Sequence, residues 1–157
     1  MNKPATVYFV RHAKAGERRI WDGADQDRPL SKTGWKQARA VAERLRSKKT
    51  SRLVSSAYVR CIQTLEPLGE ISSTEVEVDR RLSEGGDFEP VLDLLNEVPD
   101  GAVLCSHGDI IPAVIEALHR RGMELQAEPD WRKGTIWVLK RKNSKVTKGK
   151  VWSPSRT

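Results

Sequence analysis

Hydrophobic positions in this chain form short apolar runs that alternate with longer segments in which apolar residues recur every three or four positions. The short runs predict strands, and they cover residues 5–11, 52–55, 74–78 and 102–106. The longer segments predict helices, one after Ser31 and the others near 57–69, 88–97 and 109–121. Residues 134–140 and 145–152 are expected to pair as a terminal hairpin.

This alternation predicts an α/β fold in a single domain spanning residues 1–157. The expected architecture is a three-layer sandwich, with a mostly parallel central sheet, helices on both of its faces and the terminal hairpin. The chain contains no run of about 18 apolar residues, so the sequence predicts no membrane-spanning helix. The first residues lack the apolar stretch of a secretory signal, so we expect a cytoplasmic protein without a membrane partner. Cys61 and Cys105 lack the spacing of metal ligands or of a disulfide framework.

The positive charge of the chain is concentrated at its C-terminal end. The formal net charge is +7, yet residues 132–157 hold nine Lys and Arg and no acidic residue, so the preceding residues carry a slight negative excess. A basic end of about residues 140–157 can bind phosphate backbones or solvate an edge strand. We favour the solvated edge strand and do not expect a nucleic-acid partner.

Candidate catalytic residues follow two of the predicted strands. His12 lies just past the first strand, and His107 lies just past the run 102–106. Ligands of parallel α/β sheets bind outside the carboxyl ends of the strands, so both histidines should project from the same rim. Arg11 and Arg60 belong to the neighbouring loop and helix start, and Glu84 lies between them and His107 in the sequence.

These residue types suit the transfer of a phosphoryl group. A neutral imidazole can attack phosphorus and hold it as a phosphohistidine. The planar guanidinium of arginine donates two parallel hydrogen bonds to phosphate oxygens and stays charged, and a carboxylic acid can protonate the leaving oxygen. Because arginine and histidine supply the positive field that the transferred group needs, no metal ion or other cofactor is expected.

Five segments carry short motifs around these residues. They are VYFVRHAKA at 7–15, RPLSKTGWKQA at 28–38, LVSSAYVRCIQT at 53–64, RLSEGG at 81–86 and VLCSHGD at 103–109. Taken in this order, the segments resemble the motifs of the histidine phosphatase superfamily, which includes phosphoglycerate mutase. The small size and the RPL segment are most similar to the SixA-like branch, including the phosphatase domain linked to Nudix domains in some MutT-type proteins.

The resemblance implies a role for each candidate residue. His12 would be the nucleophile and Glu84 the proton donor, while Arg11, Arg60 and His107 would hold the phosphoryl group. Ala13 stands where the family more often has glycine, and its backbone carbonyl can still orient His12.

The prediction is therefore a metal-independent phosphatase that works through a phosphohistidine on His12. Arg28 and Lys14 are expected to extend its positive pocket. The SixA resemblance implies a phosphohistidine protein as substrate, the Nudix-linked resemblance implies a nucleotide or another small phosphoester, and the sequence leaves both open. An alternative from another class is a phosphate-recognising binding module with weak or no catalysis, whose basic end engages nucleic acid.

Overall fold

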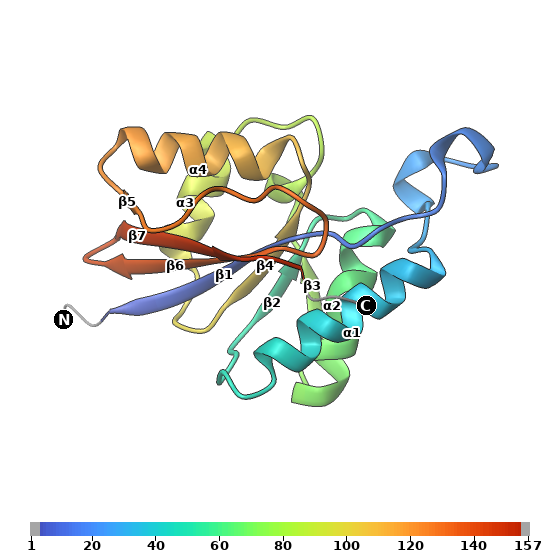
Figure 1. The fold of residues 1–157 in the computed structure, drawn as a ribbon, viewed down its shortest axis with the longest axis horizontal. Coiled ribbons are helices and arrows are strands. Elements are labelled where there is room, and N and C mark those ends of the chain that lie inside the picture. The colour runs from blue at the N-terminus through green and yellow to red at the C-terminus, as the bar shows by residue number, and fades with distance from the viewer. Residues whose placement is uncertain (1–3, 155–157) are drawn as a thin grey trace.

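The computed structural model describes residues 4–154, whose strands form one mixed sheet with helices on both faces (Figure 1). The strands follow one another in space in the order β3-β2-β4-β1-β6-β7-β5. Their bounds are β1 (Ala5–Arg11), β2 (Leu53–Ser55), β3 (Val76–Val78), β4 (Val103–Ser106), β5 (Glu124–Leu125), β6 (Ile136–Lys142) and β7 (Lys145–Trp152). The predicted α/β class is confirmed.

The sheet has a parallel half and an antiparallel half. In the parallel half, β2 pairs with β3 and β4, and β4 pairs with β1. In the antiparallel half, β6 pairs with β1 and β7 pairs with β6, while the short β5 runs parallel to β7. The predicted hairpin is thus present and joins the parallel strands through β1. β5 was not predicted, because two residues are too few to give a hydrophobic pattern.

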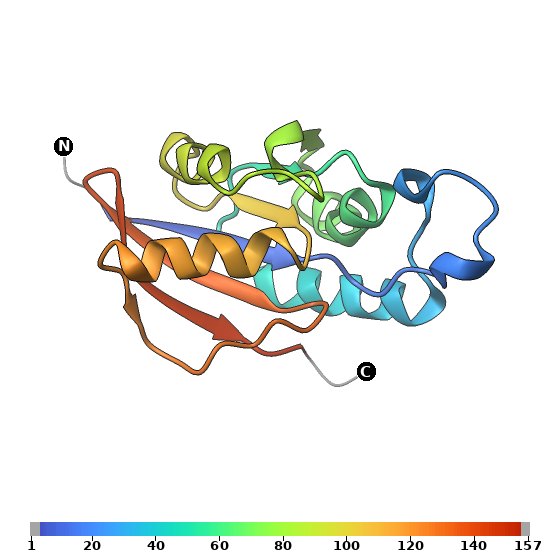
Figure 2. The same ribbon diagram turned by 90° about the horizontal axis from the view of Figure 1, so that it is seen from above.

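Two helices cover each face of the sheet (Figures 1 and 2). On one face lie α1 (Lys32–Leu45) and α2 (Val59–Ser72), and on the other lie α3 (Glu89–Glu97) and α4 (Ile110–Arg120). Ser31 caps α1 as expected, since its side chain accepts a hydrogen bond from the Gly34 amide at 3.0 Å. Three short 3-10 turns complete the elements: η1 (Arg18–Ile20), η2 (Asp25–Asp27) and η3 (Arg80–Leu82).

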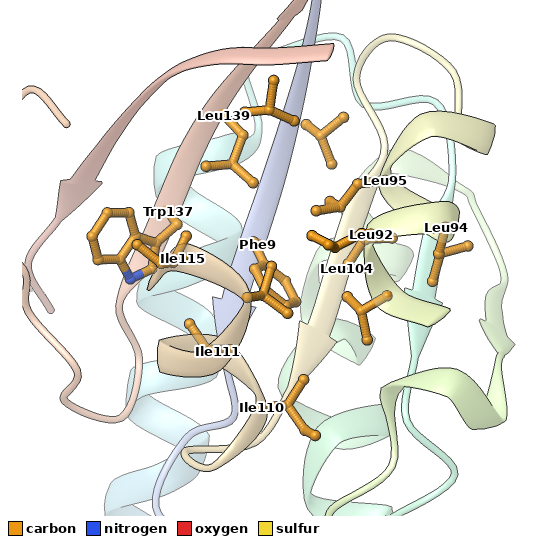
Figure 3. Packing of buried hydrophobic residues seen from close by; sticks show 14 of the residues in the cluster. Phe9, Leu92, Leu94, Leu95, Leu104, Ile110, Ile111, Ile115, Trp137 and Leu139 are labelled. Carbon is orange, nitrogen blue, oxygen red and sulfur yellow. The ribbon is translucent and has the colours of Figure 1, made fainter. Parts of the chain in front are cut away.

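Strand β1 is buried on both faces and separates the two halves of the core. Phe9 packs into the cluster under α3 and α4, whereas its neighbour Val10 packs into the cluster under α1 and α2. Figure 3 shows Phe9 between Leu104 of β4 and Ile111 of α4. Continuous burial of this kind is typical of a strand inside an α/β sheet, and it fixes the position of the residues that follow β1.

Most of the basic C-terminal end belongs to the hairpin. Lys140, Lys148 and Lys150 are exposed residues of β6 and β7. Residues 155–157, which the prediction included in the basic end, lie outside the described residues. Separately, no helix within residues 4–154 is long and apolar enough to cross a membrane.

Candidate active site

The two candidate histidines lie side by side at the carboxyl ends of β1 and β4. Arg11 ends β1 and is in register with Ser106, which ends β4, so His12 and His107 follow at the same level of the sheet. Their ring centroids are 5.4 Å apart. Figure 2 shows both strands pointing toward the segment that links β1 to α1. The parallel register of these strands therefore places residues 95 positions apart at one site.

His12 is buried and held in a single orientation. Its backbone amide donates to the Ser106 carbonyl at 3.1 Å, and its ring Nδ1 is 2.7 Å from the Ala13 carbonyl oxygen. A carbonyl only accepts, so Nδ1 carries the hydrogen and Nε2 keeps its lone pair. Burial, together with the charges of His107 and Arg60, lowers the pKa of His12 to about 3. The ring is consequently neutral near pH 7, and it lines the cavity with an unprotonated Nε2.

One side of the His107 ring contacts α2 and the loop that precedes it. Its Nε2 lies 2.8 Å from the Ser56 hydroxyl and 3.5 Å from the Cys61 sulfur. The Ser56 oxygen also accepts a hydrogen bond from the Tyr58 amide at 3.2 Å. On the other side of the ring, Nδ1 is buried without a hydrogen-bond partner in the described part of the chain and lies 3.8 Å from Glu84 Oε1. That nitrogen is left for a ligand.

Arg11 and Arg60 bring two guanidinium groups to the same cavity. Arg60 is almost fully buried, whereas Arg11 is half-buried and donates a hydrogen bond to the Trp131 carbonyl. The Nε atoms of both arginines are buried and have no partner among residues 4–154. Gly108 leaves the room that Arg11 needs, because a Cβ there would lie 2.5 Å from its Nη2.

Asp25 links the arginines and was not predicted as a site residue. Its carboxylate accepts hydrogen bonds from Arg60 Nη2 at 3.1 Å and from Arg28 Nε at 3.0 Å. Partial burial favours a higher pKa for Asp25, but the hydrogen bond from Arg28 and the charge of Arg60 outweigh it and lower the pKa. In the sequence, Asp25 stands in the polar segment DGADQD at 22–27, and no spacing in that segment indicates this contact.

Glu84, Arg28 and Lys14 occupy different positions relative to the cavity. Glu84 is half-buried and accepts a hydrogen bond from Arg60 Nη2 at 3.2 Å. Arg28 is buried, lines the cavity and also donates to the Gly16 carbonyl. Lys14 is exposed and is not among the lining residues. The structure therefore brings Glu84 and Arg28 into the site and leaves Lys14 outside its wall.

The resulting cavity has a volume of about 410 Å³ and a strongly basic wall. Its lining residues are Arg11, His12, Ala15, Arg18, Arg28, Arg60, Glu84, Gly108, Asp109 and Lys133. Five of these are Arg or Lys, and two are acidic. The acids have partners in the protein: Glu84 binds Arg60, and Asp109 accepts a hydrogen bond from the Gly85 amide at 2.7 Å instead of capping α4. Such a cavity suits a small anion.

No cluster of three His, Cys, Asp or Glu side chains within the described residues is arranged to hold a metal ion. The cations of the site are its arginine and lysine side chains. A neutral nucleophilic histidine, a second histidine and buried arginines around one basic cavity suit phosphoryl transfer.

Comparison with known proteins identifies the family. Residues 7–93 match the histidine phosphatase superfamily (branch 1). Over 155 residues the chain is 32% identical to an 8-oxo-(d)GTP phosphatase of Mycolicibacterium smegmatis, which covers 95% of this chain and 48% of that protein. The chain thus spans about half the length of this relative.

Two solved structures extend the match over almost the whole chain. The protein histidine phosphatase SixA complexed with tungstate superposes with a TM-score of 0.75 at 24% identity, covering 96% of both chains. A SixA-type protein from Nakamurella multipartitia gives a TM-score of 0.72 at 27% identity, covering 98% of both chains. The fold is an α/β fold, and its basic cavity suits a phosphoryl group. The chain belongs to the histidine phosphatase superfamily, as the motifs of the sequence indicated.

Proposed function

We propose that this domain is a phosphatase that transfers a phosphoryl group from its substrate to Nε2 of His12 and then to water. In the first step, the lone pair of Nε2 attacks phosphorus while the bond to the leaving oxygen breaks. Arg11, Arg60 and His107 bind the three outer oxygens of the transferred group. The positive charges of the two arginines and the N–H groups of all three residues stabilise its negative charge. In the second step, water attacks phosphorus and releases inorganic phosphate and the free imidazole.

Glu84 is the proposed proton donor to the leaving oxygen and the base for the attacking water. Its Oε1 lies 3.8 Å from His107 Nδ1 and 3.2 Å from Arg60 Nη2, so it stands beside the proposed phosphoryl site. One carboxyl can serve both steps, because the proton that it gives up in the first is recovered from water in the second.

The observation that carries this proposal is the grouping of buried, unpartnered nitrogen atoms at the site of His12. Among residues 4–154, five buried side-chain nitrogen or oxygen atoms lack a hydrogen-bond partner. Three of the five are Arg11 Nε, Arg60 Nε and His107 Nδ1. A buried polar atom without a partner costs roughly 1–3 kcal/mol, so their grouping at one cavity supports a bound oxyanion as the missing partner.

Hydrolysis of p-nitrophenyl phosphate in excess chelator tests the proposal. We expect the chain to release nitrophenolate under these conditions and the His12→Ala variant to lose at least about 10³-fold in kcat, because the nucleophile is gone. Quenching the reaction in base and searching for a phosphate on His12, stable to base and labile to acid, tests the intermediate itself. Equal rates for both proteins would remove the proposed mechanism.

The identity of the leaving group separates two proposed substrate classes. SixA neighbours favour a phosphohistidine protein, and the relative from Mycolicibacterium smegmatis is named for a nucleotide substrate. A panel of phosphohistidine proteins, sugar phosphates and nucleotides distinguishes the classes by kcat/KM. A cytoplasmic location stays a prediction from the sequence.

A further inference from the structure

Lys133 is a cavity residue to which the proposed mechanism gives no role. It lies in the loop between β5 and β6, and it lines the same cavity as His12 and Arg11. Its neighbour in the sequence, Arg132, forms an ion pair with Asp130 at 2.6 Å. Lys133 forms no ion pair with a carboxylate in the part of the chain that the structure describes.

The loop around Lys133 is attached directly to Arg11. The Trp131 carbonyl accepts a hydrogen bond from the Arg11 side chain, the Gly134 amide donates to the Arg11 carbonyl at 3.1 Å, and the Arg11 amide donates to the Thr135 carbonyl at 3.1 Å. Gly134 takes a positive φ of 84°, which lets the chain turn there. Trp131 also stacks on Trp137 of β6 at 5.3 Å between ring centroids. Lys133 is therefore held beside the arginine that binds the transferred phosphoryl group.

The charges around Lys133 differ from those around the other cations of the cavity. Arg18, Arg28 and Arg60 each form an ion pair with Asp25. Lys133 instead faces cations: burial, followed by the charges of Arg11 and Arg28 and then of Lys14 and Arg60, lowers the pKa of its amine. Placing an ammonium among like charges is unfavourable in the free protein. An anion bound next to Arg11 would remove that cost and gain the attraction of Lys133.

One phosphoryl group already has its own donors at this site. Arg11, Arg60 and His107 surround His12, so the ammonium of Lys133 is available for a second anionic group. Because the loop that carries Lys133 is hydrogen-bonded to Arg11, a group bonded directly to the transferred phosphoryl group is the candidate for this second anion. A volume of about 410 Å³ falls within the range of small-molecule sites and exceeds what one phosphate needs.

We propose that Lys133 forms a second phosphate subsite and that the leaving group of the reaction is itself a phosphate, as in a nucleoside diphosphate. This inference rests on the proposed function of His12. Nε2 attacks the terminal phosphorus, the bond from that phosphorus to the bridging oxygen breaks, and the electron pair stays on the departing monophosphate, whose new charge Lys133 stabilises. Water then cleaves the N–P bond. The net reaction converts a diphosphate ester and water into a monophosphate ester and inorganic phosphate.

Selectivity between two substrates tests the subsite. We expect Lys133→Met to lower the ratio of kcat/KM for adenosine diphosphate to kcat/KM for p-nitrophenyl phosphate by about 10- to 100-fold, the range for a lost charged hydrogen bond. Lys133→Arg should recover most of this ratio. Lys142→Met, which removes the same charge from the distant hairpin, should leave it within twofold. An unchanged ratio in Lys133→Met would overturn the inference while leaving the phosphatase proposal intact.

Binding gives a second measurement that does not depend on turnover. Calorimetric titration with imidodiphosphate, which resists hydrolysis, should show affinity falling about 10- to 100-fold in Lys133→Met, and titration with inorganic phosphate should show a smaller loss. 3-Phosphoglycerate tests a carboxylate as the second anion. If Lys133→Met lowers kcat/KM for 3-phosphoglycerate but not for adenosine diphosphate, the inference is also overturned. If the wild-type chain hydrolyses neither phosphate substrate, the proposed function fails, and the titrations still decide whether Lys133 binds a second phosphate.

Discussion

The parallel half of the sheet and the antiparallel hairpin contribute to the same cavity in different ways. The parallel strands β1 and β4 present His12 and His107 from the ends of their backbones, so the strand register alone sets the spacing of the two rings. The hairpin presents none of its strand residues to the cavity wall and contributes instead through the loop before β6, which contacts Arg11 and carries Lys133. Strand register thus places the two histidine rings, whereas one loop places Lys133.

Among changes that leave His12 in place, the largest loss of activity is expected from changing Arg60, which α2 delivers to the parallel half. Arg60→Met removes a buried donor to the phosphoryl oxygens and leaves Asp25 and Glu84 without this partner. We expect kcat/KM for p-nitrophenyl phosphate to fall about 10²- to 10³-fold. Arg39→Met, on the exposed side of α1, is the matched control and should stay within twofold. Similar losses in both variants would show that Arg60 acts only through general charge.

A smaller loss is expected from adding one methyl group next to Arg11. In Gly108→Ala the new Cβ would lie 2.5 Å from Arg11 Nη2, so the guanidinium must move away from the phosphoryl site and strain its bond to Trp131. We expect kcat/KM to fall about 10- to 100-fold, because a misplaced catalytic group loses much of its effect.

Gly16→Ala provides the control for this change, since the nearest atom to a Cβ at Gly16 is 4.0 Å away. Its effect on kcat/KM should be much smaller. Equal effects of the two alanines would contradict the role given to the room beside Gly108.

The pH dependence of stability should reveal the buried imidazole. The folded state lowers the pKa of His12 from 6.5 to about 3, so the unfolded chain binds a proton that the folded chain excludes between these values. His12 therefore contributes stability above about pH 6.5 that is lost progressively as the pH falls toward 3. Urea unfolding of the wild-type chain and of His12→Gln at pH 7, 5.5 and 4.5 should show a steeper decline for the wild-type chain. Parallel declines would mean that His12 is protonated in the folded protein.

The smallest effect is expected in the antiparallel half. Lys148 is exposed on β7 and lies outside the cavity of His12. Lys148→Gln should leave kcat/KM within twofold and the free energy of unfolding within about 0.5 kcal/mol. A large loss of activity would show that the hairpin strands, and not only the loop before β6, take part in the reaction.

The sequence predicted the parts of the site that depend on strand ends. The positions of His12 and His107 after two strand-like runs were enough to bring them together, because parallel strands expose their carboxyl ends at one rim. Asp25 could not be selected in the same way, since its neighbours in the DGADQD loop are also acidic and only the folded loop brings it to Arg60. The contact of the Ser56 hydroxyl with His107, 51 positions away, likewise follows from the fold and from no local pattern.

The position of Lys133 in the cavity wall could not be predicted from the pattern of residues. Lys133 reaches the cavity because β6, which follows it in the sequence, pairs with β1 near the start of the chain. In the sequence it belongs to a run of basic residues, and nothing distinguishes it there from the lysines that follow. Lys133 is itself exposed, and the long-range register, rather than local composition, decides which exposed lysine lines the cavity.

The hydrogen bond from Arg11 to the carbonyl of Trp131 has a consequence for protein synthesis. A nascent chain that has emerged only as far as α4 already contains His12, His107 and Arg60. Trp131, whose carbonyl accepts the hydrogen bond from Arg11, is then still inside the ribosome. Arg11 can therefore take its folded position only after β6 docks on β1, and a chain released before Trp131 would lack the carbonyl that orients this side chain.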